Sequence, residues 1–181
     1  MAIPTGTHRL GPDDASLEVR TYREGVAAMA GHDLIIGVTR WDATLEAAAD
    51  PAGWRIELNA DPGSLEVREG LRGVKPLTDR DRVEIRKNID TKVLGREPIR
   101  FSSSAVRPGD GGRVAVEGEL TMAGRTRPVA LELTHGDGGA LTGTVSLKQS
   151  DWGIKPYRGL MGALKVRDDV EVVVEATLPP G

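Results

Sequence analysis

Hydrophobic and polar residues alternate along most of this chain, and this period of two is the feature that most restricts its fold. The alternation runs over six segments, residues 17–22, 54–59, 114–122, 129–133, 141–147 and 170–176. Successive side chains of a β-strand point to opposite faces, so each segment predicts a strand with one buried and one solvated face. This pattern is typical of antiparallel sheets, because strands of parallel sheets are apolar on both faces. Turn sequences rich in Gly, Pro and Asp separate the segments, as in a β-sandwich or a β-barrel.

One change of phase indicates a corner in the sheet. The apolar positions are even in segment 34–38 and odd in segment 41–45. A bulge or sharp bend near Thr39 and Arg40 would keep both sets facing inward, and a sheet that closes into a barrel needs such corners. We therefore expect an all-β fold, an antiparallel lipocalin-like β-barrel of about eight strands. The whole chain, 1–181, is expected to be a single domain.

A single helix is expected near residues 78–94. Thr78 can cap its N-terminus with Asp81 three residues later, and Gly95 can end it. Its apolar stripe, which recurs every fourth residue, consists of Ile85, Ile89 and Val93. This stripe is expected to lie against a mouth or a wall of the barrel.

Composition excludes several classes of protein. The chain has no cysteine, which excludes disulfides, thiolate catalysis and cysteine metal sites. The net charge of -3 argues against a nucleic-acid partner, since such proteins usually carry a basic surface. The first residues lack the apolar core of a signal peptide, and no apolar run approaches the ~20 residues of a transmembrane helix. We expect a cytoplasmic protein without a transmembrane segment.

Three segments, in order, carry a family resemblance. Segment 116–129 contains the strand-turn-strand pattern G-x-L-T-x-x-G-x-T-[KR]-P-V; segment 98–103 reads PIRFSS, and segment 150–154 reads SDWGI. Together they resemble the YceI-like family. The resemblance implies a lipocalin-like barrel with an apolar tunnel for polyisoprenoid-type ligands, such as quinone or prenyl lipids. Segment 13–16 lacks the histidine usual in the family, which implies a divergent branch.

A barrel of eight strands either fills itself with side chains or holds one small ligand. The alternation places an uncharged and mostly small set of side chains inside. The residues predicted to line a lumen are Leu17, Val19, Ile36, Trp54, Ile56, Leu58, Phe101, Val114, Val116, Gly118, Leu120, Leu131, Gly143, Val145, Leu147 and Val172. Glycine weakens a strand unless something approaches it closely, so Gly143 favours a guest. The alternative is an ordinary filled aliphatic core.

Polar candidates for chemistry are few. His32 and Asp33 are adjacent, but His8 and His135 lie on separate segments, so no metal site is expected. We expect His32 to be a turn residue that is hydrogen-bonded locally or faces a ligand head group. Segment 102–104 offers serines without a nucleophile elbow, so we expect no catalytic set. We expect His32 to form a mouth or gate together with three apolar residues that are flanked by glycines, Tyr157, Leu160 and Met161.

Three functions follow from this interpretation. The first is binding, carriage or storage of a long apolar, isoprenoid-like lipid, with no enzymatic activity and no cofactor apart from a bound isoprenoid quinone or polyprenyl lipid. The second is a cyclase or isomerase of lipid or secondary metabolism that works by confinement, for which a titratable residue deep in the barrel is needed. The third is a protein-interaction module with a filled barrel. The sequence also allows a second copy of the chain as a partner, in a homodimer.

Overall fold

The computed structural model describes residues 3–178, and more than half of it is β-strand. The strands are β1 (Gly6–Leu10), β2 (Ala15–Thr21), β3 (Arg23–Glu24), β4 (Asp33–Val38), β5 (Trp41–Ala47), β6 (Arg55–Ala60), β7 (Leu65–Leu71), β8 (Ile99–Pro108), β9 (Arg113–Met122), β10 (Arg125–His135), β11 (Ala140–Lys148), β12 (Arg158–Gly159), β13 (Leu164–Val166) and β14 (Asp169–Thr177). The helix α1 (Asp79–Asn88) continues into a π-helical turn, Ile89–Val93. All six alternating segments fall on strands, with Tyr22 and Trp54 just outside them, so the predicted all-β class is confirmed.

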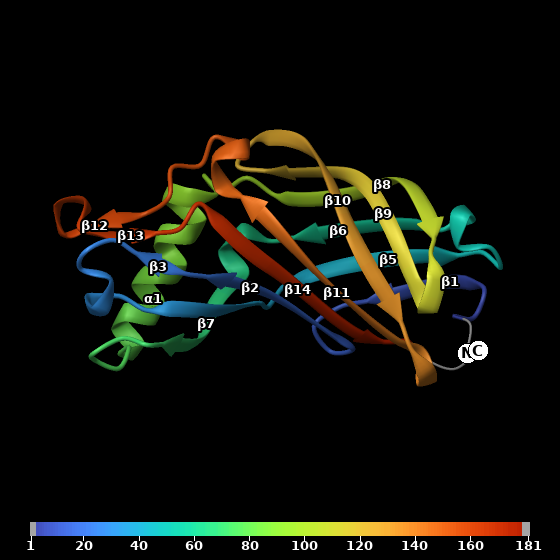
Figure 1. Ribbon diagram of the computed structural model, residues 1–181, viewed down its shortest axis with the longest axis horizontal. Coiled ribbons are helices and arrows are strands. Elements are labelled where there is room, and N and C mark those ends of the chain that lie inside the picture. Colours follow the sequence, from blue (N-terminus) through green and yellow to red (C-terminus); the bar gives the residue numbers. More distant parts are fainter. Residues whose placement is uncertain (1–2, 179–181) are drawn as a thin grey trace.

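Eleven strands form one antiparallel sheet in the order β1-β5-β6-β8-β9-β10-β11-β14-β2-β4-β7. The sheet curls strongly on itself into a lipocalin-like barrel, in which β1 and β7 are the edge strands (Figure 1). In the described residues β1 and β7 do not pair with each other, and the ring of paired strands closes instead where β4 bends into β5 and β6 bends into β7.

Two bent strands join the ends of this sheet. The first bent strand runs from β4 to β5 through Thr39 and Arg40. The second, which pairs with the first, runs from β6 to β7 through residues 61–64. The Thr39 amide donates to the Ser64 carbonyl at 2.8 Å, and Arg40 forms a 3.0 Å ion pair with Asp61. The predicted bend is therefore confirmed, and apolar residues on both sides of it line one interior. If β4 and β5 are counted as one bent strand, β6 and β7 as another, and the short β1 is left out, the eleven strands become the predicted eight.

The helix α1 lies across one end of the barrel, beside β7 (Figure 1). The Asp81 amide donates to the Thr78 hydroxyl at 3.2 Å, and the Thr78 amide donates to the Asp81 carboxylate at 2.9 Å. Arg82 donates to two carbonyls of β7 at 2.8 and 3.0 Å, which fixes the helix to the barrel edge. The helix ends before Gly95, whose φ is +62°. The predicted helix and its N-cap are confirmed.

The two ends of the barrel differ in construction. We call the end that carries α1 and the small sheet β12-β13-β3 the mouth. The opposite end, which carries the β5–β6, β8–β9 and β10–β11 turns, we call the closed end. Figure 1 shows the mouth on the left and the closed end on the right.

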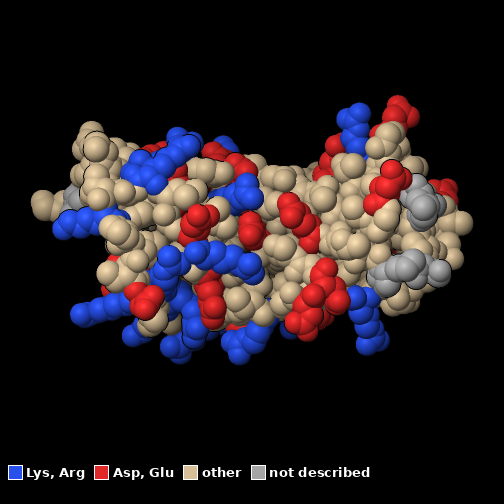
Figure 2. All heavy atoms as spheres, turned by 90° about the horizontal axis from the view of Figure 1, so that it is seen from below, with Lys and Arg blue, Asp and Glu red and all other residues tan. Residues whose placement is uncertain are grey.

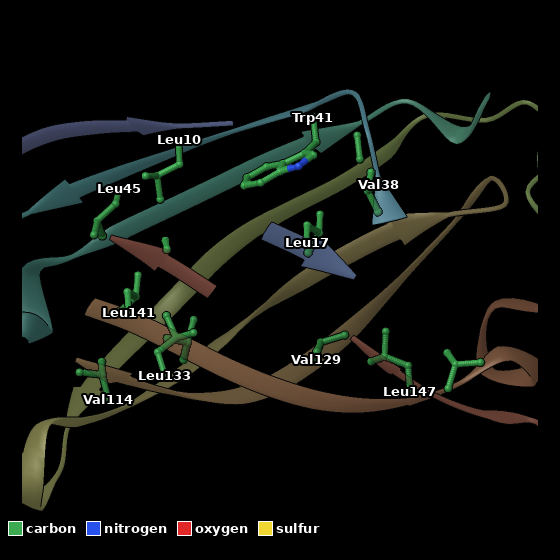
Figure 3. Close-up of a cluster of buried hydrophobic side chains, with 14 of the residues drawn as sticks. Leu10, Leu17, Val38, Trp41, Leu45, Val114, Val129, Leu133, Leu141 and Leu147 are labelled. Atoms are coloured by element: carbon green, nitrogen blue, oxygen red, sulfur yellow. The ribbon is translucent and has the colours of Figure 1, made fainter. Parts of the chain in front are cut away.

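Tightly packed apolar side chains fill the closed end. Val114, Leu133 and Leu141 are 1%, 5% and 6% exposed, and Leu45 reaches them from across the barrel (Figure 3). Leu178, just after β14, is also only 1% exposed. Because these residues come from strands all round the barrel, their contacts hold its wall together at this end.

Candidate functional site

The barrel encloses a cavity of about 610 Å³. This volume falls within the ~300–1,000 Å³ of typical ligand pockets. The wall is almost entirely apolar, and the helix contributes Ile85, Ile89 and Val93 on its inner side. The apolar stripe of the helix therefore faces the cavity rather than a packed wall.

Most of the predicted lumen residues line this cavity. They are Leu17, Val19, Ile36, Ile56, Leu58, Phe101, Val116, Leu120, Leu131, Gly143, Val145, Leu147 and Val172. The pleat of the strands dictates this placement, since every second side chain must point inward. Contact of these residues with a guest stays a prediction.

Three predicted lumen residues do not line the cavity. Trp54 precedes β6 and is buried at the closed end, where its indole N–H donates to the Ala48 carbonyl at 3.0 Å. Val114 is buried in the closed-end packing below the cavity. Gly118 is covered by the ring of Phe101, because a Cβ there would lie 2.7 Å from the ring carbon Cζ. The space at Gly118 thus accommodates a neighbouring side chain.

Gly143 needs a similar correction. It borders the cavity, but a Cβ at this position would lie 2.6 Å from a methyl group of Leu133 and 3.1 Å from the Glu132 carbonyl oxygen. The group that approaches Gly143 closely is therefore Leu133 of the neighbouring strand. The glycine by itself is no sign of a guest.

The inward side chains fall into two sets. The closed-end core, defined here as Val114, Leu133, Leu141 and Leu178, is almost completely buried, although Leu133 and Leu141 also border the inner end of the cavity. The lumen wall, defined as Val19, Phe101, Leu120, Leu131, Val145 and Val172, is only partly buried although it faces inward. Because the wall residues point into the barrel, the surface that they leave accessible is the surface of the cavity.

Polar side chains line the cavity mainly at the mouth. They are Thr21, Arg23, His32, Asp81, Glu84, Asn88, Gln149, Tyr157 and Lys165, with Thr44 of β5 in addition. The cavity is thus apolar in its depth and polar where α1, β3 and β13 surround it. Such an arrangement suits an elongated guest with one polar end.

An ion network around Asp33 orders the mouth. Asp33 is 7% exposed and accepts a hydrogen bond of 2.9 Å from the Arg23 amide. The guanidinium of Arg72 lies 3.5 Å from its other oxygen. Arg23 also donates to the carbonyls of Ala28 and Gly31 at 3.1 and 3.0 Å, and its side chain borders the cavity. A buried carboxylate is stable here because two guanidinium groups face it.

The residues predicted for a mouth or gate lie in different places. His32 borders the cavity, and its Nε2 lies 2.6 Å from the carbonyl oxygen of Lys75, a residue distant in the sequence. Tyr157 borders the cavity and is 54% exposed. Met161 is completely exposed and does not line the cavity. The side chain of Leu160 lies outside the described part of the structure. A gating role stays a prediction.

Sequence reasoning missed the cationic groups of the mouth. Arg23 and Lys165 border the cavity from β3 and β13, which are two and three residues long. Strands this short show no readable alternation. Leu77 and Leu164 were missed for the same reason, since they lie in or beside loops. The helix stripe, His32 and Tyr157 were the sequence signals that pointed to this end of the cavity.

Tyr22 links β14 to the mouth. Its hydroxyl donates to Glu171 at 2.9 Å, and the guanidinium carbon of Arg167 lies 5.9 Å from the ring centre. The hydrogen bond to Glu171, and then partial burial, raise the pKa of the Tyr22 phenol above its ordinary value of 10.0. The neutral phenol is thus favoured in the folded protein.

Within residues 3–178, no group of three His, Asp or Glu side chains is placed to hold a metal ion. In the same residues, no helix has both the length and the apolar character needed to cross a bilayer.

Comparison with solved structures shows the fold. BcnA of Burkholderia cenocepacia superimposes with a TM-score of 0.65 at 17% identity, over 89% of this chain and 94% of that protein. The YceI protein of Campylobacter jejuni superimposes with a TM-score of 0.54 at 14% identity, over 78% of this chain and 82% of that one. No curated protein sequence shows significant similarity to the chain.

The sequence itself matches the family model for the YceI-like domain over residues 13–178. The match covers the barrel, α1 and both ends of the cavity, so the resemblance seen in the sequence motifs is confirmed. This chain belongs to the YceI-like domain family.

Proposed function

We propose that this protein binds a long apolar molecule, an isoprenoid-like lipid, inside its barrel and carries or stores it. The observation that carries the proposal is the unfilled apolar cavity of about 610 Å³ behind a polar mouth. The YceI-like family is generally one of binding proteins, which supports this proposal over an enzymatic one.

The lumen wall gives a physical reason to bind a guest. Protein interiors are normally close-packed, and side chains that face a void lose the contacts that a neighbour would provide. An apolar chain that enters the cavity gains roughly 25 cal/mol for each Å² of apolar surface removed from water. The partly buried residues Val19, Leu120 and Val172 offer such surface.

The polarity of the wall orients the guest. An apolar tail would lie toward Trp41, deep in the barrel, and a polar head would remain near Arg23, His32 and Lys165. An isoprenoid quinone or a polyprenyl lipid has this shape, since each joins a branched hydrocarbon tail to a polar head. Lys165 can donate hydrogen bonds to the oxygens of such a head.

The test is to identify what the protein carries. Protein purified without detergent should release an apolar compound into an organic extract, detectable by mass spectrometry. After delipidation it should bind a fluorescent prenyl probe saturably. An extract without lipid, together with no probe binding by the folded delipidated protein, would overturn the proposal.

Two neighbouring residues of β11 provide a matched control. Val145 faces the cavity, whereas Thr144 is exposed on the outer face. Val145→Phe should weaken probe binding about tenfold or more, equivalent to ~1.4 kcal/mol, because the ring takes guest volume. Thr144→Phe should leave probe binding unchanged. Equal effects of the two substitutions would place the probe outside the lumen.

The enzyme hypothesis gains no support from the site. Catalysis by confinement would require a titratable group deep among the apolar residues. In the described residues, the titratable side chains that line the cavity belong to α1, β3, β13 and the segments beside them.

A further inference from the structure

Exposed apolar side chains gather at the mouth of the barrel. The large hydrophobic residues that are exposed in the described part of the chain are Val26, Met29, Leu71, Val74, Val83, Tyr157 and Met161. Val83 lies on α1, and the others lie in three segments around it, residues 25–32, 71–77 and 153–167, which we call the mouth loops. Val26 is 97% exposed and Met161 is fully so. Apolar surface concentrated in one place usually marks an interaction site.

The charge of the mouth loops is of one sign. They carry six cationic residues, Arg72, Lys75, Lys155, Arg158, Lys165 and Arg167, and no Asp or Glu, although the whole chain has a net charge of -3. Figure 2 shows Lys and Arg gathered toward the mouth on the left, and Asp and Glu more numerous toward the closed end on the right. The apolar side chains therefore project from a locally cationic surface.

Hydrogen bonds join the mouth loops into one surface. The Ala27 amide donates to the Ala163 carbonyl at 2.9 Å, and the Val74 amide donates to the Met29 carbonyl at 3.3 Å. Arg23 also donates to the carbonyl of Arg72. These hydrogen bonds connect all three loops to one another and to the Asp33 network, beside residues that border the cavity.

We propose that the mouth loops dock the protein on an anionic lipid bilayer, so that the cavity exchanges its guest directly with the membrane. The proposal rests on the function proposed above, because an apolar guest passes through water unfavourably. Lysine and arginine attract anionic head groups, while the apolar tips of Val26 and Met161 enter the interface between head groups and acyl chains. Tyr157 joins an apolar ring to a polar hydroxyl, a side chain that prefers this interface.

An acidic protein surface would also complement the cations. The bilayer is the better match because the exposed apolar residues sit at separate loop tips around an opening to a lipid-sized cavity.

The experiment is sedimentation of the full chain with vesicles of phosphatidylcholine alone and of phosphatidylcholine mixed with phosphatidylglycerol. Wild type should sediment with the mixed vesicles, and less so as salt is raised, because salt screens charges at the bilayer surface. Lys155→Gln combined with Arg158→Gln should lower partition onto these vesicles by about thirtyfold. Val26→Glu combined with Met29→Glu should lower it by about tenfold or more.

The matched control lies at the other end of the barrel. Arg55 and Arg113 are exposed at the closed-end starts of β6 and β9, and neither lines the cavity. Arg55→Gln combined with Arg113→Gln removes the same charge, and it should leave vesicle binding unchanged. Equal losses in both double variants would show attraction by net charge alone and would overturn docking through the mouth. Absence of wild-type binding to the mixed vesicles would overturn it as well.

Probe binding without vesicles separates this proposal from the function on which it rests. None of Val26, Met29, Lys155 and Arg158 lines the cavity, so these variants should bind the prenyl probe like wild type. Intact probe binding with no vesicle binding by wild type would refute docking alone. Vesicle binding without probe binding would refute the lumen function and leave only a peripheral membrane protein.

Discussion

The closed-end core and the lumen wall lie on the same strands, yet they pack in opposite ways. On β10, Leu133 is 5% exposed, whereas Leu131, the next inward residue toward the mouth, remains partly accessible from the cavity. At the closed end, Leu45 and Leu10 reach across to Leu133 (Figure 3). Farther along, the lumen wall borders the cavity, and α1 lies across its end. Strand alternation decides which side chains face inward, but the side chains opposite decide whether the interior is filled.

The largest expected effect is the difference in folding stability lost when Leu133 and Leu131 are each replaced by alanine. Leu133→Ala should destabilise the protein by about 2–5 kcal/mol, because it removes a side chain that is almost completely buried. Leu131→Ala should cost about 1 kcal/mol, since this side chain is only partly buried and loses fewer contacts. Chemical denaturation of delipidated protein measures both. Equal losses would mean that the wall is packed as tightly as the core.

A larger side chain should destabilise the closed-end core but not the lumen wall. Val114→Phe should cost about 1–3 kcal/mol, because the side chain it replaces is 1% exposed and has no room to grow. Val145→Phe should leave stability unchanged or raise it slightly, because the ring fills part of the cavity. Thermal unfolding of the delipidated variants gives the comparison. Destabilisation by Val145→Phe as large as that by Val114→Phe would indicate a filled barrel.

A smaller effect concerns the ionisable groups of the mouth. The raised pKa of Tyr22 means that its hydrogen bond to Glu171 stabilises the fold below pH 10.0, and that this contribution is lost as the pH rises through the folded-state pKa. Tyr22→Phe should therefore be less stable than wild type at neutral pH and should approach it in alkaline solution. Urea denaturation across this range tests the sign. A stability difference that grows with rising pH would contradict it.

Much of the fold could be predicted from the sequence because its main signals are local. Alternation placed the inward residues, the phase change located the bend at Thr39 and Arg40, and Thr78 with Asp81 marked the start of the helix. Each of these depends on backbone geometry within a few residues.

The details of the site depend on contacts between distant segments. Whether Phe101 covers Gly118, or Leu133 covers Gly143, is decided by side chains on a neighbouring strand. The cations of the mouth lie on very short strands and loops without periodicity. Alternation alone could not reveal that these loops meet at one end of the cavity.

The most direct test of a hollow, guest-binding barrel uses its three tryptophans. Trp41 lines the cavity, whereas Trp54 and Trp152 are buried outside it. A long alkyl probe brominated at its tail should quench the protein's fluorescence saturably, because bromine quenches an indole that it contacts. We expect strong quenching in the double variant Trp54→Phe and Trp152→Phe, which retains Trp41, and little quenching in Trp41→Phe, with folding of both verified by circular dichroism. Absence of saturable quenching in folded wild type, or equal quenching in the two variants, would contradict a guest in the lumen.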